Sequence, residues 1–309
     1  GLALAVAGMA LIGLSSSAGL LATGILVAGA SSGLVWVPFS DTVATDLPAG
    51  ARDRALAAIS SGTGWGVALA VPIALVAGTA WRSAWLAFAV LALAALLWSL
   101  RVLPGRISAA AASGLPPLRP GWFVCPRSGP LLAGSFLIGL GASAYWTFAV
   151  DHVVQAGGAD PRDARLLLAV VGVASILGSL AADLVRHAGG RAGLAATALA
   201  LSAALLLAGL APGSWPAVMA SAVLFGAAYN LVVAIQVIWS SIVFADRPSA
   251  GLAGVAVLLG VGMLAGPLAG GALAGPLGMD GVFALAAGVA ALAGLLTPRE
   301  RLSPASAQA

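Results

Sequence analysis

The stretch Gly262-Met-Leu-Ala-Gly-Pro-Leu-Ala-Gly-Gly271 places four glycines and one proline in a strongly apolar part of the chain. Both residue types weaken a helix in water, but in lipid, glycines spaced four apart let two helix backbones approach closely. Pro267 removes one backbone hydrogen bond and bends the helix. We therefore expect a bent, tightly packed membrane helix that can pack against its partner in two ways, as a hinge or a sliding seam. Ordinary small-residue packing is the alternative, because the chain has 41 glycines.

Composition indicates that the chain is an integral membrane protein. Of its 309 residues, 61% are hydrophobic and 8% are charged, whereas about a quarter of the residues of soluble domains are charged. All 14 basic residues are arginines that lie singly or in pairs, so we expect no nucleic-acid partner. Cys125 is the only cysteine, which excludes an intrachain disulfide and argues against a metal site or another cofactor.

Glycines, prolines and charge clusters divide the chain into ten expected helices and no strands. A bilayer core requires about 20 apolar residues per helix, and only the first run falls short of that length. Several runs are long enough to be tilted or kinked, and we expect kinks within 64–72 and within the quoted stretch. The expected helices lie near 2–14, 18–45, 53–78, 82–103, 130–155, 164–186, 192–211, 214–244, 249–276 and 280–297.

The arginines test this division, because basic residues collect in cytoplasmic loops. Loops after every second helix contain Arg52, Arg54, Arg101, Arg106, Arg119, Arg127, Arg186, Arg191, Arg247, Arg299 and Arg301, and the opposite loops contain Arg82, Arg162 and Arg165. This bias predicts a multi-pass protein of the inner or plasma membrane with a cytoplasmic C-terminus.

The connection 104–129 is rich in proline and arginine, and we expect it to be a cytoplasmic linker. It separates 1–103, the expected remainder of an N-terminal bundle, from 130–298, the expected six-helix C-terminal bundle, and leaves 299–309 as a cytoplasmic tail. Two bundles on a tether can rock against each other, as secondary transporters require. Because the chain starts with Gly1 and a short apolar run, we expect two further helices before it, which would give six helices in each bundle.

The quoted stretch resembles a motif of the major facilitator superfamily of secondary transporters. It matches the pattern G-x-x-x-G-P-x-x-G-G through Gly262, Gly266, Pro267, Gly270 and Gly271. With two helices missing, it falls on the eleventh of the family's twelve helices, and the related segment 61–72 on the fifth is looser. The resemblance implies a polytopic 6+6 bundle in which 1–103 holds family helices 3–6 and 130–298 holds family helices 7–12.

A cytoplasmic loop and one further helix also carry the resemblance. The helix at 20–33, LLATGILVAGASSG, resembles the family's fourth helix, but Ile25 stands where a buried arginine is common, which argues against the proton-coupled drug antiporters. The loop at 178–191, GSLAADLVRHAGGR, resembles G-x-L-A-D-R-x-G-R through Gly178, Asp183, Arg186, Gly190 and Arg191.

By this resemblance, Asp183, Arg186 and Arg191 form a cytoplasmic gate latch near Arg52 and Arg54. A carboxylate at a helix N-terminus is stabilised by the helix dipole. The latch would hold the cytoplasmic side shut and release during turnover. Ordinary interfacial anchoring by charged side chains is the alternative.

Substrate contacts are implied on the family's fourth, seventh and tenth helices, where polar and aromatic residues without buried charge favour a neutral or amphipathic organic solute. Interhelical hydrogen bonds, worth about 0.6 kcal/mol each, are the alternative role for these residues. The expected cavity residues are Ser32, Trp36, Tyr145, Trp146, Tyr229, Asn230 and Gln236.

The segment VDHVVQ at 150–155 places Asp151 beside His152 near the expected outer end of a helix. Histidine is the side chain that titrates near neutral pH, so this pair is a candidate proton relay. Interfacial placement of two polar residues is the simpler explanation.

These features predict a transporter that moves a small organic solute by alternating access, driven by a gradient. Its expected partners are the lipid bilayer, the solute and protons, and we expect a monomer. A complete ten-helix drug/metabolite-type transporter and an inactive truncated product are the alternatives. A membrane enzyme is not expected, because neither a paired nucleophile and base nor clustered carboxylates occur at membrane depth.

Overall fold

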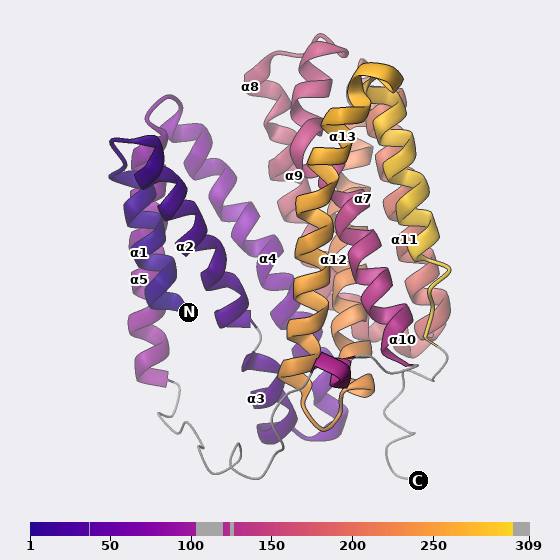
Figure 1. The fold of residues 1–309 in the computed structure, drawn as a ribbon. Helices are drawn as coiled ribbons and strands as arrows, with labels where there is room; N and C mark the ends of the chain where they lie inside the picture. Colours follow the sequence, from indigo (N-terminus) through magenta and orange to yellow (C-terminus); the bar gives the residue numbers. More distant parts are fainter. Residues whose placement is uncertain (37, 103–119, 124–126, 299–309) are drawn as a thin grey trace. The chain divides into compact units, whose positions relative to one another are not determined.

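The computed structural model describes residues 1–36, 38–102, 120–123 and 127–298. Most of the expected linker 104–129 and the whole expected tail 299–309 therefore lie outside the described residues. The described chain is helical throughout and contains no strand, which confirms the expected all-α fold (Figure 1).

Contacts divide the chain into two compact units. Unit 1 comprises Gly1–Pro38 and Ile73–Cys125, and unit 2 comprises Phe39–Pro72 and Pro126–Ala309. The expected division into bundles at 103 and 130 stays a prediction.

Unit 1 is built from α1 (Leu2–Gly13), α2 (Ala18–Trp36) and α5 (Trp81–Val102). The backbones of α1 and α2 approach closely, because a Cβ on Gly8 would lie 2.7 Å from the Cα of Ala28. At the end of α1, Arg82 Nε donates a hydrogen bond to the carbonyl oxygen of Ser15 at 3.1 Å. This bond ties the α1–α2 turn to the first turn of α5.

Unit 2 contains the helices that position the expected site. Their bounds are α3 (Pro38–Asp46), α4 (Ala49–Ala77, whose first part belongs to this unit), α7 (Ser128–Gln155), α8 (Pro161–Ala164), α9 (Leu166–Ser175), the 3-10 helix η2 (Ile176–Leu180), α10 (Ala181–Ala188), α11 (Gly190–Leu210), α12 (Trp215–Val243) and α13 (Pro248–Ala293). Helices α7, α11, α12 and α13 lie side by side (Figure 1). Tyr145, Phe225 and Phe283 are among the largest fully buried side chains of this core.

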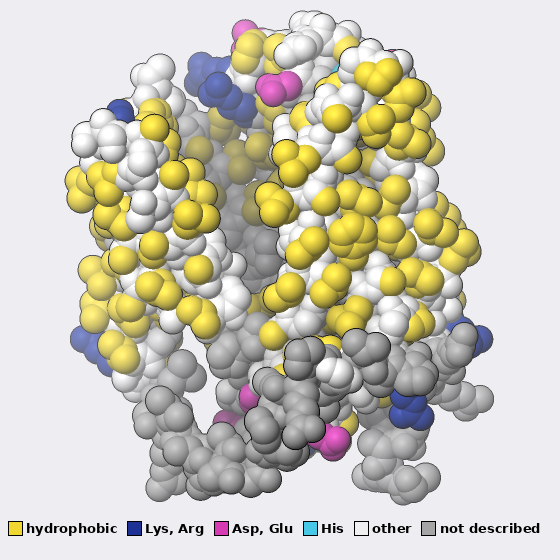
Figure 2. All heavy atoms as spheres, in the orientation of Figure 1, with side chains coloured by type: hydrophobic (Ala, Val, Ile, Leu, Met, Phe, Trp, Pro, Cys, Tyr) yellow, Lys and Arg dark blue, Asp and Glu magenta, His cyan; other side chains and the backbone are white. Residues whose placement is uncertain are grey.

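The surface of both units is apolar along the helices, as a lipid-facing protein requires. Figure 2 shows hydrophobic side chains along the visible flanks of the helices and charged side chains near helix ends. The side chains of Leu264 and Leu268 on α13 are 70% and 72% exposed. Exposing these side chains to water would cost free energy. Exposing them to lipid does not, because lipid tails are as apolar as leucine.

The expected count of ten helices is slightly off. Eight described helices are long and apolar enough to cross a membrane, and Leu2–Gly13 is a shorter apolar helix. The count differs because 248–293 is counted as one run, although Gly278, with φ 71 and ψ 168, separates two helices at the expected boundary between 276 and 280. That conformation is open to glycine and strained for other residues. Helical φ and ψ angles continue through Pro267, and the break at Gly278 lies about three helical turns beyond that proline.

Candidate transport site and gating contacts

The glycine motif on α13 forms a close contact with α7 inside unit 2. Gly262, Gly266 and Gly270 are buried on one face at a spacing of four. A Cβ on Gly262 would lie 2.7 Å from the backbone nitrogen of Leu140, and one on Gly266 would lie 2.7 Å from the carbonyl oxygen of the same residue. Because these positions leave no room for a side chain, the glycines are what allow α13 and α7 to pack backbone to backbone.

The two remaining residues of the motif lie off this face. Gly271 is exposed, and a Cβ there would meet nothing within 4 Å. Pro267 is half-buried and sits within the helix. The described contacts of the motif are thus within one unit, and its role as a moving seam stays a prediction.

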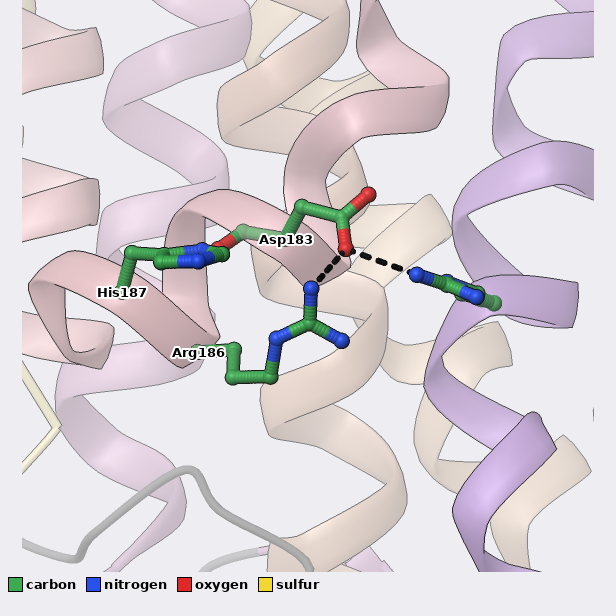
Figure 3. A network of polar contacts seen from close by, with 4 residues as sticks. Asp183, Arg186 and His187 are labelled. Carbon is green, nitrogen blue, oxygen red and sulfur yellow. Dashed lines mark hydrogen bonds and ion pairs between the residues drawn. The ribbon is translucent and has the colours of Figure 1, made fainter.

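Asp183 is the centre of a polar cluster at the start of α10 (Figure 3). Its Oδ1 accepts hydrogen bonds from Arg54 Nη2 at 3.1 Å and from Arg186 Nη2 at 2.6 Å. The ring nitrogen Nδ1 of His187 lies 2.7 Å from the backbone oxygen of Asp183. Arg54 comes from α4, so the cluster joins α4 to α10. All these side chains are partly exposed, which lets water compete for the contact.

The other expected gate residues bind elsewhere. Arg191 Nε donates to the carbonyl oxygen of Pro298 at 2.8 Å, and Arg52 Nε donates to that of Leu47 at 3.0 Å. The structure therefore brings Asp183 and Arg186 together with Arg54. Arg191 and Arg52 bind backbone carbonyl oxygens outside this cluster.

A second polar contact at a helix start was not expected from the sequence. Asp41 of α3 accepts a hydrogen bond on Oδ1 from the backbone nitrogen of Ser249 at 3.0 Å. Ser249 is the second residue of α13, and α13 has no side-chain cap of its own. The first backbone N–H groups of a helix lack intrahelical partners and favour an anion. Asp41 therefore caps α13 from a part of the chain about 200 residues away.

Four aromatic rings form a cluster between α7 and α12. The rings of Tyr145 and Phe225 stack at 3.9 Å, and those of Phe225 and Tyr229 stack at 5.7 Å. Trp146 meets both Phe225 and Tyr229 edge-on, at 5.6 and 6.0 Å. Sequence reasoning named three of these rings and missed Phe225, which lies at the centre.

The four rings differ in exposure. Tyr145 is fully buried, and its hydroxyl shares a hydrogen bond with Ser221 Oγ at 2.9 Å. Trp146 and Tyr229 are only half-buried, and within the described residues neither side chain has a hydrogen-bond partner. Their indole N–H and phenol hydroxyl are therefore the polar groups of the cluster that have no hydrogen-bond partner among the described residues.

Asn230 and Gln236 are buried in the packing of unit 2. Asn230 Nδ2 lies 3.4 Å from the carbonyl oxygen of Gly226 on its own helix, and Asn230 packs against Gly178 of η2. Gln236 is 1% exposed and lies close to Gly134 of α7. Its Oε1 has no hydrogen-bond partner among the described residues, and such a buried orphan is costly unless water or a ligand satisfies it.

Ser32 and Trp36 belong to α2 in unit 1. Ser32 is exposed, and its Oγ donates to the carbonyl oxygen of Gly29 at 2.8 Å. Trp36 is half-buried. Their expected part in a common cavity with the residues of unit 2 stays a prediction.

The candidate relay residues lie in different surroundings. Asp151 is exposed. His152 is buried, and its Nε2 lies 3.1 Å from the carbonyl oxygen of Gly209 and 3.3 Å from Asp280 Oδ1. The acidic partner that the structure gives His152 is therefore Asp280 of α13, which the sequence spacing could not reveal.

The first part of α4 packs on α9 through small residues. A Cβ on Gly64 would lie 2.6 Å from the Cβ of Ser175, and one on Gly172 would lie 2.6 Å from the nitrogen of Ala68. This close approach packs α4 against α9, and the same helix α4 carries Arg54, which pairs with Asp183.

Solved structures share the fold of this chain. The human organic anion transporter MFSD10 (TETRAN) matches with a TM-score of 0.72 at 18% sequence identity, covering 96% of this chain and 75% of that chain. A variant of the E. coli fucose:proton symporter FucP matches with a TM-score of 0.64 at 16% identity, covering 95% and 81%. The chain therefore has the fold of these membrane transporters.

The family follows from the sequence itself. A family model described as "Uncharacterised MFS-type transporter YbfB" matches residues 1–298, and the chain belongs to this family of MFS-type transporters. The expected superfamily is thereby confirmed, and the eight described helices long and apolar enough to cross a membrane are those of a multi-pass membrane protein.

One curated relative bears a different name. "Transcription regulatory protein OpdE" of Pseudomonas aeruginosa is 28% identical over 200 residues, which are 63% of this chain and 48% of the relative. The chain thus spans about half the length of the curated relative it matches.

Proposed function

We propose that this protein moves a small neutral or amphipathic organic solute across the inner or plasma membrane by alternating access, as a monomer with a cytoplasmic C-terminus. The observation that carries this proposal is the pair of polar contacts that α3 and α4 make with the C-terminal helices. Arg54 binds Asp183, and Asp41 caps the start of α13. Alternating access requires contacts that hold one side shut and still open within a transport cycle.

The strength of these contacts suits a gate. Both acidic side chains are partly or fully exposed, and exposed ion pairs contribute little because water screens them. Such contacts break and re-form on the timescale of domain motions. A fully buried ion pair would hold the same helices in one state.

The solute class follows from the aromatic cluster. Trp146 and Tyr229 offer one N–H donor, one hydroxyl and two ring faces, and the four residues of the cluster carry no charge. Aromatic faces bind apolar or planar groups, and a few placed polar groups orient them. The combination of apolar ring faces with an N–H and a hydroxyl favours a solute that is apolar on one side and accepts hydrogen bonds on the other.

We further propose that a proton or solute gradient drives this movement. The family fold with its two bundles supports coupling of this kind in general. The gating role of the α13 glycines and of Asp183, Arg186 and Arg191 belongs to the same proposal.

Flux through liposomes tests the proposal. The full-length protein is reconstituted, and a panel of labelled sugars, organic anions, organic cations and neutral aromatic compounds is offered. We expect at least one neutral or amphipathic compound to cross faster than through protein-free liposomes, and Trp146→Ala to slow that flux. If none of these compounds crosses faster than the control, or if only strongly charged ones do, the proposal is wrong.

A further inference from the structure

His152 is a buried titratable group at the meeting point of three helices of unit 2. Its side chain is 4% exposed and lies near the end of α7. The Nε2 atom faces the carbonyl oxygen of Gly209 on α11 at 3.1 Å and Asp280 Oδ1 on α13 at 3.3 Å. The ring of Phe283 lies 5.2 Å away between centroids, tilted by 31°.

This geometry fixes where the imidazole protons lie. A carbonyl oxygen and a carboxylate oxygen are both acceptors, so Nε2 must donate in every protonation state. The neutral ring is therefore the Nε2–H tautomer, and the second proton enters and leaves at Nδ1. Proton uptake at Nδ1 makes the ring a cation 3.3 Å from Asp280 Oδ1 without any rearrangement of Nε2.

Acceptor groups from two other helices lie beside the ring. Gly209 is the second-last residue of α11, which ends at Leu210, and carbonyls of a last helical turn have no intrahelical partner and carry the negative end of the helix dipole. The carboxylate of Asp280, whose side chain is 66% exposed, lies beside Nε2, and the ring of Phe283 packs against the imidazole. The imidazole therefore lies between the end of α11 and the carboxylate of Asp280.

Other charged groups on the neighbouring elements do not contact the ring. On α7 itself Asp151 is exposed, and on α8 and its flanks Asp160, Arg162, Asp163 and Arg165 are exposed. On α11 the charged residue is Arg191, at the opposite end of the helix. Among the described residues, Asp280 is the charged group in contact with His152.

Two glycines make this arrangement possible. A Cβ on Gly209 would lie 3.1 Å from Cγ of Phe283, and closer still to its Cβ, so only glycine lets α13 approach the end of α11. Gly278 has φ 71 and turns the chain two residues before Asp280. The break in α13 therefore places the carboxylate beside the histidine.

We propose that His152, Asp280 and the carbonyl of Gly209 form a proton-binding site that ties α7, α11 and the part of α13 after Gly278 more tightly when His152 is protonated. Asp183 lies near the start of α11 and His152 near its end, so the site is at the end of unit 2 opposite the Asp183 cluster. By the arginine bias this is the outer end. The link to transport rests on the proposed function, whereas proton binding does not.

Thermal unfolding of the full-length protein in detergent micelles tests the site without any solute. The protein, Asp280→Asn, His152→Gln and the double variant are compared at about pH 5.5 and about pH 7.5, values on either side of the usual histidine range. We expect Asp280→Asn to lower the unfolding temperature more at the acidic pH, by about 2 °C or more beyond its effect at the higher pH. In the His152→Gln background this difference should vanish.

Two matched variants exclude other origins of a pH effect. His187→Gln removes the other of the two histidines, and Asp163→Asn removes an exposed carboxylate from the same end of unit 2. Both should keep the pH-dependent effect of Asp280→Asn. If Asp280→Asn has equal effects at both pH values, or if its pH dependence survives in His152→Gln, the proton site is overturned. A failure to find any transported solute would leave this result unchanged, so the two proposals fail separately.

Discussion

Arg54 and Asp183 lie 129 positions apart in the chain, and their side chains meet at 3.1 Å. The same Asp183 oxygen accepts a second hydrogen bond from Arg186 at 2.6 Å. One carboxylate thus holds an arginine of its own helix and one of α4. Because Asp183 lies in the first turn of α10, the helix dipole also stabilises its charge. The contact between Arg54 and Asp183 joins α4 to α10.

Asp183→Asn should open this contact. Asparagine keeps an acceptor oxygen but loses the charge, so the pair with Arg54 weakens by a factor that we expect to be less than about five, as for exposed pairs. Ala57→Cys on α4, a position that is fully buried, reports opening when it is introduced with Cys125→Ser. Labelling by a water-soluble thiol reagent should be faster in Asp183→Asn than in the parent. Equal labelling rates would leave Asp183 as an interfacial anchor only.

Asp41 should matter to α13 through its oxygen rather than its charge. Asp41→Ala removes the acceptor for the Ser249 N–H and should destabilise the protein by about 1 kcal/mol, the usual effect of a lost helix cap. Asp41→Asn keeps an acceptor of similar shape and should cost less. Thermal unfolding of the two variants checks this order, and an equal loss in both would mean that the cap bond is not what Asp41 contributes.

The α13 glycines should differ sharply from one another. Gly266→Ala forces a Cβ to within 2.7 Å of the Leu140 carbonyl oxygen and should destabilise the protein by about 1–3 kcal/mol, as overpacked cores do. Gly271→Ala adds the same methyl group where nothing lies within 4 Å, and it should be neutral or slightly stabilising. Unfolding temperatures of the two variants test the contact, and flux with Gly266→Leu tests the seam. Intact flux in a correctly inserted Gly266→Leu protein would contradict the seam.

Variants of Tyr145 and Trp146 should distinguish a packing role in the aromatic cluster from a role in solute binding. Tyr145→Phe removes a buried hydroxyl whose partner Ser221 keeps its bond to the Val218 carbonyl oxygen at 2.8 Å, so we expect a loss of about 0.6 kcal/mol in stability and an unchanged half-saturating concentration. Trp146→Ala should raise that concentration several-fold. Flux measured against solute concentration in both variants decides between the two roles. A larger rise in Tyr145→Phe than in Trp146→Ala would reverse the assignment.

Local sequence patterns revealed the helices, the family and one face of the site. The glycine spacing predicted the close packing surface that Gly262 and Gly266 form, and composition predicted the lipid-facing flanks. Long-range partners could not be read in this way, because nothing in the sequence near Asp41 or His152 indicates Ser249 or Asp280. Phe225 was not predicted, because no sequence pattern distinguishes a binding-site phenylalanine from any other apolar residue on a membrane helix. The helix count differed because a single glycine, Gly278, turns the backbone without the polar loop that normally separates two helices.

Accumulation of a solute by liposomes containing the full-length protein tests the central claim of gradient-driven alternating access most directly. A compound selected from the panel is supplied at equal concentration inside and outside, and a pH or solute gradient is then imposed. We predict net movement of the compound against its own rising gradient, and collapse of that movement when the imposed gradient is dissipated. Equal concentrations that persist across the membrane under every imposed gradient would contradict the account.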